Sequence, residues 1–172
     1  WIAILQSAGL PIPKELFVHG YLTVDGQKMS KTLGNVVDPV SLIEKYGTDP
    51  VRYYLLREIP SYADGDFSER RFKEVYNADL ANGLGNLVAR VAKLATGLEL
   101  RDLSLEFRKT ENPEYQKAME EYRFHDALAY IWEKIRDADQ YIEKTQPWKL
   151  EGKELATVLK EIIPQIITIA TL

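Results

Sequence analysis

Two apolar stripes at helical spacing constrain the fold of this chain more than any other feature. Successive members of the first stripe are four and three positions apart, and they are Leu80, Leu84, Leu87, Val91, Leu94 and Leu98. The second stripe has the same spacing, and its members are Phe124, Leu128, Ile131, Ile135, Ala138 and Ile142. Each set falls on one face of an α-helix. Because short connections join the long helical runs, we predict an antiparallel helix bundle.

The connections around these stripes carry turn signals. Ser68 is in place to cap the first helix, and a less regular link is expected over 99–111. The stretch "TQPWKLEGK" predicts a turn, because its proline and glycine interrupt the helical pattern. A third helical run follows over 153–172, and we expect it to bend at Pro164.

The N-terminal third has a different character. Residues 1–9 read as the end of a helix, and "ELFVHGYLTVDGQKM" is rich in β-forming residues, with a hairpin signal at Asp25-Gly26. Two short helices follow. The first is predicted from Asp38-Pro39 through Tyr46, and the second over "TDPVRYYLLREI". The predicted fold class is therefore mainly α, with a small α/β part over 1–67 before a helical domain over 68–172.

Composition excludes several classes of protein. The chain has 172 residues, 45% of them hydrophobic and 28% charged, so an ordered core is expected. It has no cysteine, which excludes disulfides and thiolate zinc sites and favours a reducing, cytoplasmic compartment. The net charge of −4 argues against DNA binding and confines any RNA contact to a local surface. No apolar run is long enough to span a membrane. The chain begins at Trp1 and stops at Leu172 inside apolar segments, so we interpret it as a piece of a longer polypeptide, truncated at its C-terminus.

The stretch "DGQKMSKTLGN" has the chemistry of an anion-binding loop. It supplies two ammonium groups and two hydroxyls, from Lys28, Ser30, Lys31 and Thr32. Gly26 and Gly34 allow the backbone to bend around them, so the loop could hold a polyphosphate. It is not a Walker A loop, because Asp25 and Ser30 stand where glycines are required. A solvated hairpin tip that is merely polar is the alternative.

The longer string "FVHGYLTVDGQKMSKTLGNVVDP" resembles the second signature of class I aminoacyl-tRNA synthetases, Lys-Met-Ser-Lys-Ser, with threonine as its last residue. The resemblance implies that the loop closes over ATP. Lys28 and Ser30 would contact ATP, Lys31 would stabilise the departing pyrophosphate, and Met29 would act as a buried pin. His19 and Gly20 match the stretch beside the nucleotide, although a purely structural role for His19 is the alternative.

The stretch that follows, "SLIEKYGTDPVRYYLLREIPSYADGDFSERRF", resembles the methionyl-tRNA synthetase family. Leu33 after the signature, "RYYLLRE" and "DGDFS" carry this resemblance, whereas leucine and valine enzymes usually have lysine after the signature and lack "DGDFS". A leucine- or valine-type synthetase remains the alternative. Asp64 and Asp66 lack the rest of a calcium loop, so we expect them to brace a linker that the resemblance identifies as the stem-contact segment.

The same resemblance assigns anticodon reading to the helical domain. "NGLGNLVARV" supplies Asn86 and Arg90, spaced i, i+4 on one helix face, and "TQPWKL" supplies Pro147 and Trp148. Trp148 offers a stacking surface, Asn86 an amide for a base edge, and Arg90 a planar fork for a base or phosphate. The alternative is that Trp148 only plugs the core and Arg90 is only a surface charge.

The implied activity is the ATP-dependent joining of methionine to tRNA(Met), with Mg²⁺ accompanying ATP. The first family signature, His-Ile-Gly-His, and the zinc-bearing insertion do not occur in these residues. We therefore expect this chain alone to bind tRNA without catalysing the reaction and to bind no metal. A non-catalytic helical interaction module is the rival hypothesis.

Overall fold

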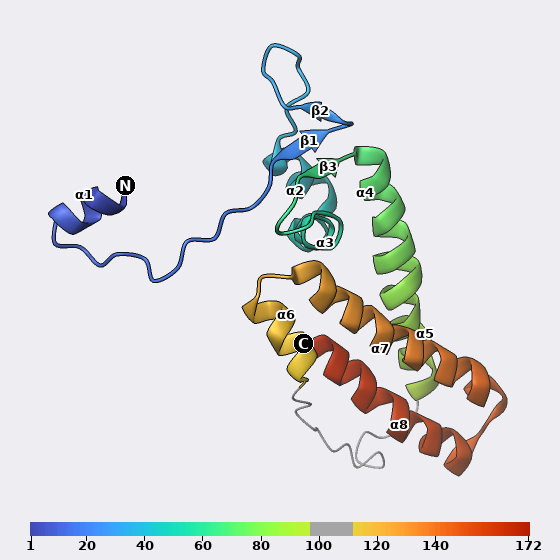
Figure 1. The fold of residues 1–172 in the computed structure, drawn as a ribbon. Coiled ribbons are helices and arrows are strands. Elements are labelled where there is room, and N and C mark those ends of the chain that lie inside the picture. Colours follow the sequence, from blue (N-terminus) through green and yellow to red (C-terminus); the bar gives the residue numbers. More distant parts are fainter. Residues whose placement is uncertain (97–111) are drawn as a thin grey trace.

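The computed structural model describes residues 1–96 and 112–172 (Figure 1). Leu98 of the first stripe and the predicted link over 99–111 lie outside the described residues. The described chain is mostly helical and contains one small sheet of three strands. This confirms the prediction of a mainly α fold with a small β-containing part. No helix among these residues is both long and apolar enough to cross a membrane.

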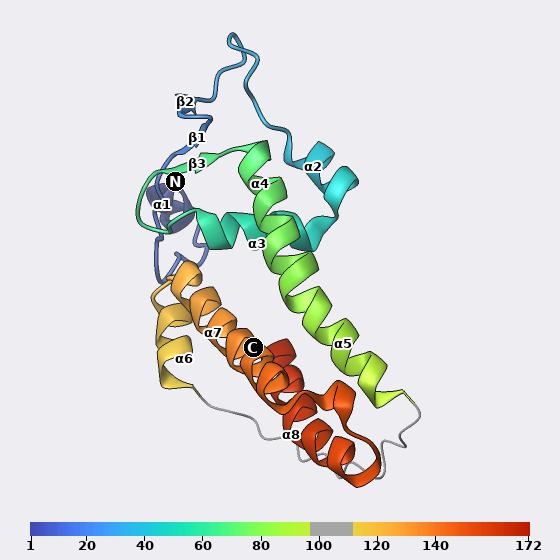
Figure 2. The ribbon, with the colours of Figure 1, turned by 90° about the vertical axis from the view of Figure 1, so that its right-hand side faces the viewer.

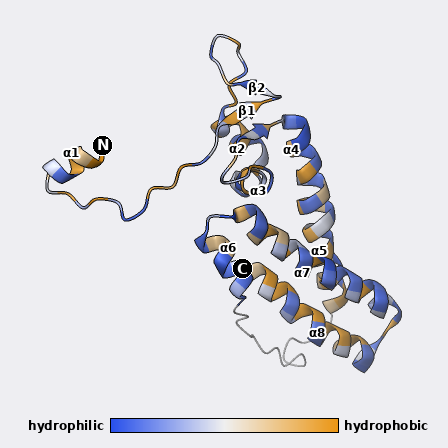
Figure 3. Ribbon diagram, viewed as in Figure 1, coloured by the Kyte–Doolittle hydropathy of each residue, from blue (hydrophilic) through white to orange (hydrophobic). Residues whose placement is uncertain are grey.

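An extended arm forms the N-terminus (Figure 1). It begins with helix α1 (Ile2–Ser7), which confirms the predicted helix end but buries none of its residues. Many apolar side chains of the arm are exposed, Ile4 by 70% and Val18 by 74%, and Figure 3 shows these hydrophobic stretches in orange. The expectation of β structure from residue 15 onward is wrong for 15–21, which form no strand.

The sheet joins a hairpin to a distant third strand. Its strands are β1 (Leu22–Val24), β2 (Gln27–Lys28) and β3 (Gly65–Phe67), in the order β2-β1-β3. β1 and β2 are antiparallel, which confirms the predicted hairpin. The turn residues Asp25 and Gly26 have φ values of 49° and 75°, as in a primed turn. β3 is parallel to β1 and places Asp66 opposite Thr23. It lies inside "DGDFS", where we expected only a linker.

Two short helices complete the N-terminal body. They are α2 (Pro39–Tyr46) and α3 (Thr48–Glu58), close to the predicted ranges. Asp38 caps α2, because its carboxylate accepts hydrogen bonds from the Val40 amide at 3.0 Å and the Ser41 hydroxyl at 2.8 Å. The core of this body, which we call the first core, consists of Val24, Val51, Tyr54, Phe67, Phe72 and Val75.

A single long helical rod links this body to the bundle (Figure 2). It consists of α4 (Glu69–Val75), the π-helix η1 (Tyr76–Gly85) and α5 (Asn86–Ala95). Ser68 occupies the N-cap position as predicted, but its side chain makes no capping hydrogen bond. Because α4 supplies Phe72 and Val75 to the first core while α5 supplies Leu87 and Val91 to the second, the rod belongs to both. The π-helix therefore lies between the two cores.

The bundle packs α5 against the C-terminal helices. These are α6 (Pro113–Glu120), α7 (Phe124–Thr145), the short 3₁₀ helix η3 (Pro147–Lys149) and α8 (Gly152–Thr171). α7 and α8 run antiparallel, side by side (Figures 1 and 2). The second core comprises Leu87, Val91, Ile135, Ala138, Ile142, Leu159, Ile162 and Ile169. The members of the first stripe from Leu84 to Leu94 and those of the second from Ile131 to Ile142 therefore face the interior, as predicted. Helix α6 was not predicted, and it begins where the Asn112 side chain accepts a hydrogen bond from the Tyr115 amide at 2.8 Å.

Candidate functional site

The loop after β2 is closed by its own hydrogen bonds. The Ser30 amide donates to Asn35 Oδ1 at 2.8 Å, and Asn35 Nδ2 donates to the carbonyl of Lys28 at 3.2 Å. Between these two points, the partly buried Met29 side chain packs against the first core. Gly34 has a φ of 66°, and its amide donates to the Lys31 carbonyl at 3.3 Å. The lysine loop, residues 28–35, is therefore held by one apolar anchor and one amide brace.

Both lysines of this loop point their charge into solvent. Lys28 and Lys31 are exposed, and within residues 1–96 and 112–172 neither forms an ion pair with a carboxylate. The Ser30 hydroxyl oxygen accepts a hydrogen bond from the Thr32 amide at 3.2 Å, so its own O–H remains available as a donor. Two positive charges and a hydroxyl donor on one short loop are suited to a polyanion such as a phosphate chain.

Gly20 has a steric reason to be glycine. A Cβ at this position would lie 2.1 Å from the Ala63 carbonyl oxygen and 2.6 Å from the Asp64 amide nitrogen. The close approach lets the Tyr21 carbonyl accept a hydrogen bond from the Gly65 amide at 2.8 Å. The neighbouring His19 is exposed, with Nδ1 only 2.7 Å from the Gly20 carbonyl oxygen. Both residues lie just before β1, in the non-strand segment that leads into the hairpin.

The two aspartates of "DGDFS" brace the structure, as predicted. Asp64 Oδ1 accepts a hydrogen bond from the Tyr21 amide at 2.7 Å. Asp66 Oδ1 accepts from the Thr23 hydroxyl at 2.6 Å and from the Gly26 amide at 2.8 Å, and these two bonds lower the pKa of Asp66. They therefore fasten β3 to the β1–β2 hairpin that carries the lysine loop. In the described part of the chain no group of three or more acidic or histidine side chains could hold a metal ion.

The turn between α7 and α8 presents an exposed tryptophan. Gln146 adopts a left-handed conformation, Pro147 is buried, and the Trp148 side chain is 51% exposed. The alternative that Trp148 plugs the core is therefore wrong, because about half of its side chain is exposed. A large aromatic ring half open to solvent is a surface on which another ring could stack.

Arg90 is fixed by two carboxylates of the neighbouring helix. It forms ion pairs with Asp139 and with Glu143, the latter at 3.0 Å, and its side chain is 31% exposed. Arg90 therefore fastens α5 to the half of α7 that leads into the Trp148 turn. The alternative that Arg90 is only a surface charge is wrong, because these ion pairs join two helices. Asn86 is exposed one helical turn earlier on α5. The turn between α7 and α8 lies at one end of the molecule, and the loop after β2 lies at the opposite end (Figure 1).

A hydrogen-bond relay between the body and the bundle was not predicted. Trp132 Nε1 on α7 donates to the Tyr53 hydroxyl on α3, and that hydroxyl donates to Asp79 on the π-helix. Gly83 on the same π-helix lies directly against the Trp132 ring. No sequence signal could have found this relay, because its members are scattered along the chain and meet only after folding.

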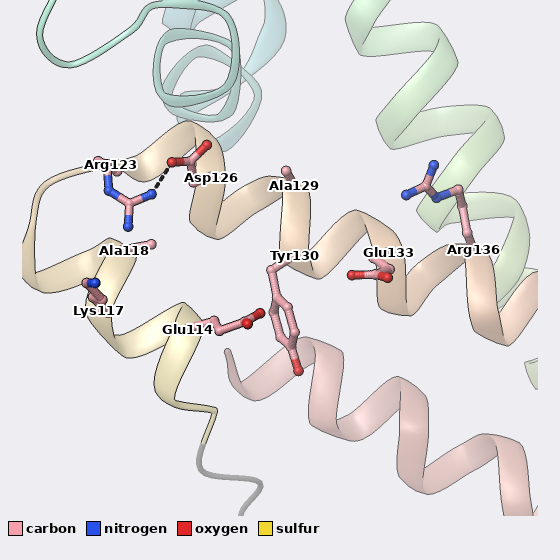
Figure 4. A pocket seen from close by; sticks show the side chains of 9 residues that line it. All are labelled: Glu114, Lys117, Ala118, Arg123, Asp126, Ala129, Tyr130, Glu133 and Arg136. Atoms are coloured by element: carbon pink, nitrogen blue, oxygen red, sulfur yellow. Dashed lines mark hydrogen bonds and ion pairs between the residues drawn. The ribbon is translucent and has the colours of Figure 1, made fainter.

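Figure 4 shows a hollow between α6 and α7. It has a volume of about 610 Å³ and is lined by Glu114, Lys117, Ala118, Arg123, Asp126, Ala129, Tyr130, Glu133 and Arg136. Arg123 is paired with Asp126 and with Glu121, so its charge is already compensated. None of the predicted site residues lines this hollow.

Comparisons with known proteins identify the family of this chain. The family model described as tRNA synthetases class I (M) matches residues 1–92, which is more than half of the 172 residues. A methionine–tRNA ligase of Thermotoga maritima is 43% identical over 99% of this chain, and one of Clostridium acetobutylicum is 41% identical over 99%. The chain spans only 30% and 29% of the length of these relatives.

Solved structures show the same likeness. A Mycobacterium tuberculosis methionyl-tRNA synthetase in complex with methionyl-adenylate superposes with a TM-score of 0.75 at 34% identity, covering 98% of this chain and 36% of that one. The apo form gives a TM-score of 0.71 at 31% identity, over 99% of this chain and 36% of that one. The leucine- or valine-type alternative finds no support in these matches. The chain belongs to the class I tRNA synthetases of the methionyl type.

Proposed function

We propose that this chain is part of a methionine–tRNA ligase, which activates methionine with ATP and transfers it to tRNA(Met). The observation that carries the proposal is the pair Lys28 and Lys31. Both stand exposed on a braced turn, without a carboxylate partner among the described residues, in a chain of the methionyl family. Membership of the family supports the proposed reaction. The two lysines without a carboxylate partner among the described residues support the proposal that this loop binds the phosphates.

In the activation step, the methionine carboxylate attacks the α-phosphorus of ATP. Methionyl-adenylate forms, the bond to the bridging oxygen breaks, and negative charge collects on the departing pyrophosphate. Lys31 stabilises that charge, and Lys28 and the Ser30 hydroxyl hold the phosphate chain. Mg²⁺ accompanies ATP in this proposal. Met29 anchors the loop to the first core. His19 and Gly20 lie beside the nucleotide.

In the recognition step, the bundle reads the CAU anticodon. Anticodon bases are single-stranded and can be turned outward, and the half-exposed Trp148 ring offers one of them a stacking surface. Asn86 pairs with a base edge through its amide. Arg90 keeps N–H donors beyond those directed at Asp139 and Glu143, and these contact a base or a phosphate.

Residues 1–67 form the edge of the catalytic domain in this proposal, including the stem-contact segment. Residues 68–172 form the anticodon-binding domain. The remaining catalytic machinery belongs to a longer protein that acts in the cytoplasm, where tRNA is charged. The partners are tRNA(Met), ATP and methionine, without DNA or a membrane.

An RNA titration tests the recognition step. We expect the chain to prefer an anticodon stem-loop with CAU over one with a changed anticodon. Trp148→Ala should weaken CAU binding by about 5- to 150-fold, the equivalent of about 1–3 kcal/mol for one stacked base. Trp1→Ala is the matched control, because Trp1 is also exposed, by 68%, but lies in the arm. Equal affinity of both RNAs for wild type and Trp148→Ala would favour a non-catalytic interaction module.

An exchange assay tests the activation step. The 172-residue chain alone should show no methionine-dependent ATP–pyrophosphate exchange. A longer protein that also contains the first signature should show it, and Lys31→Ala should lower that rate by about 10²- to 10³-fold. Exchange catalysed by the short chain alone would refute this division of labour.

A further inference from the structure

We propose that Asn35 is a positioning residue, which fixes the lysine loop in the conformation needed for methionine activation. This inference rests on the proposed function of the loop and adds a residue to it. Asn35 touches no reacting atom in the proposal. It holds the backbone of Lys28 and Ser30, and through them it positions the adjoining Lys31.

The Asn35 amide makes two hydrogen bonds of opposite polarity to the same short segment. Its oxygen accepts from the Ser30 amide at 2.8 Å, and its nitrogen donates to the Lys28 carbonyl at 3.2 Å. The two backbone groups flank Met29, which packs on the first core. The segment from Lys28 to Ser30 is therefore held on one side by apolar packing and on the other by a single side chain.

Only an amide of this length satisfies both groups together. Alanine offers neither bond, and aspartate can accept from the Ser30 amide but cannot donate to the Lys28 carbonyl. The chain returns to Asn35 through Gly34, whose φ of 66° favours glycine. The reversal brings Asn35 back across the loop to the residues that precede Lys31.

The brace determines the position of the backbone from which the Lys28 and Lys31 side chains extend. Their side chains are long and flexible, so the direction of each charge depends first on the backbone that carries it. A fixed backbone lowers the entropy lost when the lysines engage a phosphate chain. A catalytic group displaced by about 1 Å can cost about 10²-fold in rate. Loss of the brace should therefore slow activation more than it weakens binding.

A kinetic comparison of the two half-reactions tests this role in the full-length protein that contains this chain. Asn35→Ala should lower the kcat of methionine-dependent ATP–pyrophosphate exchange by about 10- to 100-fold, with the KM for methionine unchanged. Transfer from preformed methionyl-adenylate to tRNA should keep its rate, because that step releases no pyrophosphate. Leu33→Ala is the matched control, since Leu33 lies in the same loop and is 66% exposed.

Amide hydrogen exchange tests the brace without relying on activity. In Asn35→Ala the Ser30 amide should exchange about 5- to 10-fold faster than in wild type, because a net hydrogen bond is lost. Asn35→Asp should restore the protection of the Ser30 amide, since its carboxylate keeps the acceptor. Leu33→Ala should leave that amide unchanged.

Three outcomes would each overturn part of this proposal. Equal losses in activation and transfer would reduce Asn35 to general stability and overturn the positioning role. Unchanged Ser30 exchange in Asn35→Ala would overturn the brace itself. If the wild-type full-length protein showed no methionine-dependent exchange, the proposed function would fail and the positioning role with it, while Ser30 exchange would still show whether Asn35 shapes the loop.

Discussion

The indole N–H of Trp132 donates a hydrogen bond of 2.5 Å to the hydroxyl of Tyr53. That hydroxyl in turn donates to Asp79 Oδ2 at 2.6 Å, and Arg57 Nε lies 3.8 Å from the same carboxylate oxygen. Burial, together with the bond to Asp79, raises the pKa of Tyr53, so its phenol keeps its proton and remains a donor. The relay joins α7, α3 and the π-helix, and it fastens the bundle to the body with the lysine loop.

Removal of the Tyr53 hydroxyl should loosen this junction. Tyr53→Phe leaves the Trp132 N–H and the Asp79 carboxylate without their partner, so we expect the free energy of unfolding to fall by about 1–3 kcal/mol. Chemical denaturation measures it. Tyr21→Phe is the control, because the Tyr21 side chain is 80% exposed. A double-mutant cycle with Trp132→Phe should show coupling, and strictly additive effects would contradict the relay.

Gly83 should not tolerate even a methyl group. A Cβ there would lie 2.9 Å from Trp132 Cζ3 and 3.2 Å from the Ala78 carbonyl oxygen. In an exposed helix, alanine stabilises by about 1 kcal/mol relative to glycine. At Gly83 the cost of overpacking should exceed that gain in helix propensity. We therefore expect Gly83→Ala to lower the free energy of unfolding by about 1–3 kcal/mol. Thermal unfolding measures it against Asn82→Ala, an exposed neighbour in the same π-helix. A higher melting temperature for Gly83→Ala would contradict the packing.

Gly20→Ala should separate the arm from β3. The added Cβ would meet the Ala63 carbonyl oxygen at 2.1 Å, which is backbone and cannot simply rotate away. We expect a loss of stability of about 2 kcal/mol or more, with faster hydrogen exchange at the Gly65 amide that bonds to Tyr21. Val18→Ala is the control, because Val18 is 74% exposed in the same arm. Unchanged exchange at Gly65 would show that the backbone contact is not required.

Glu69 should stay ionised far into the acid range. Its Oε1 lies 3.0 Å from Lys45 Nζ and 3.2 Å from Lys73 Nζ, and also accepts from the Tyr46 hydroxyl. The hydrogen bond from Lys45, followed by those from Lys73 and Tyr46, lowers the pKa of Glu69 from 4.5 to about 2. Because the folded pKa is the lower one, this contribution to stability is present above pH 4.5 and is lost as the pH falls toward 2.

A carbon-13 titration of the Glu69 carboxyl measures that pKa. Lys45→Met should move the midpoint back toward the ordinary value, because the largest cause of the shift is then gone. Lys160→Met, an exposed lysine on α8, should leave it in place. A wild-type midpoint close to 4.5 would contradict the α2–α4 ion pairs.

Local signals predicted the elements that local chemistry controls. The Asp25-Gly26 hairpin, the Asp38 cap of α2 and the turn at Pro147 follow from backbone preferences that act within a few residues. The bundle core follows from stripes whose spacing matches the helical period. The lysine loop could also be predicted from the sequence, since its charged residues lie close together along the chain.

Contacts between distant residues were decided only by the tertiary structure. Three residues of β3 carry too little periodicity to predict a strand, and the strand exists because β1 lies beside it. Asn35 gave no signal of its own, because its role depends on a reversal at Gly34 that brings it onto Ser30. Sequence by itself determined the helical bundle, the hairpin and the charged loop, since each rests on interactions between near neighbours. The tertiary structure decided that Arg90 is paired, that Trp148 rather than Pro147 is exposed, and that Trp132 meets Tyr53, because burial and pairing between separate helices depend on how those helices pack.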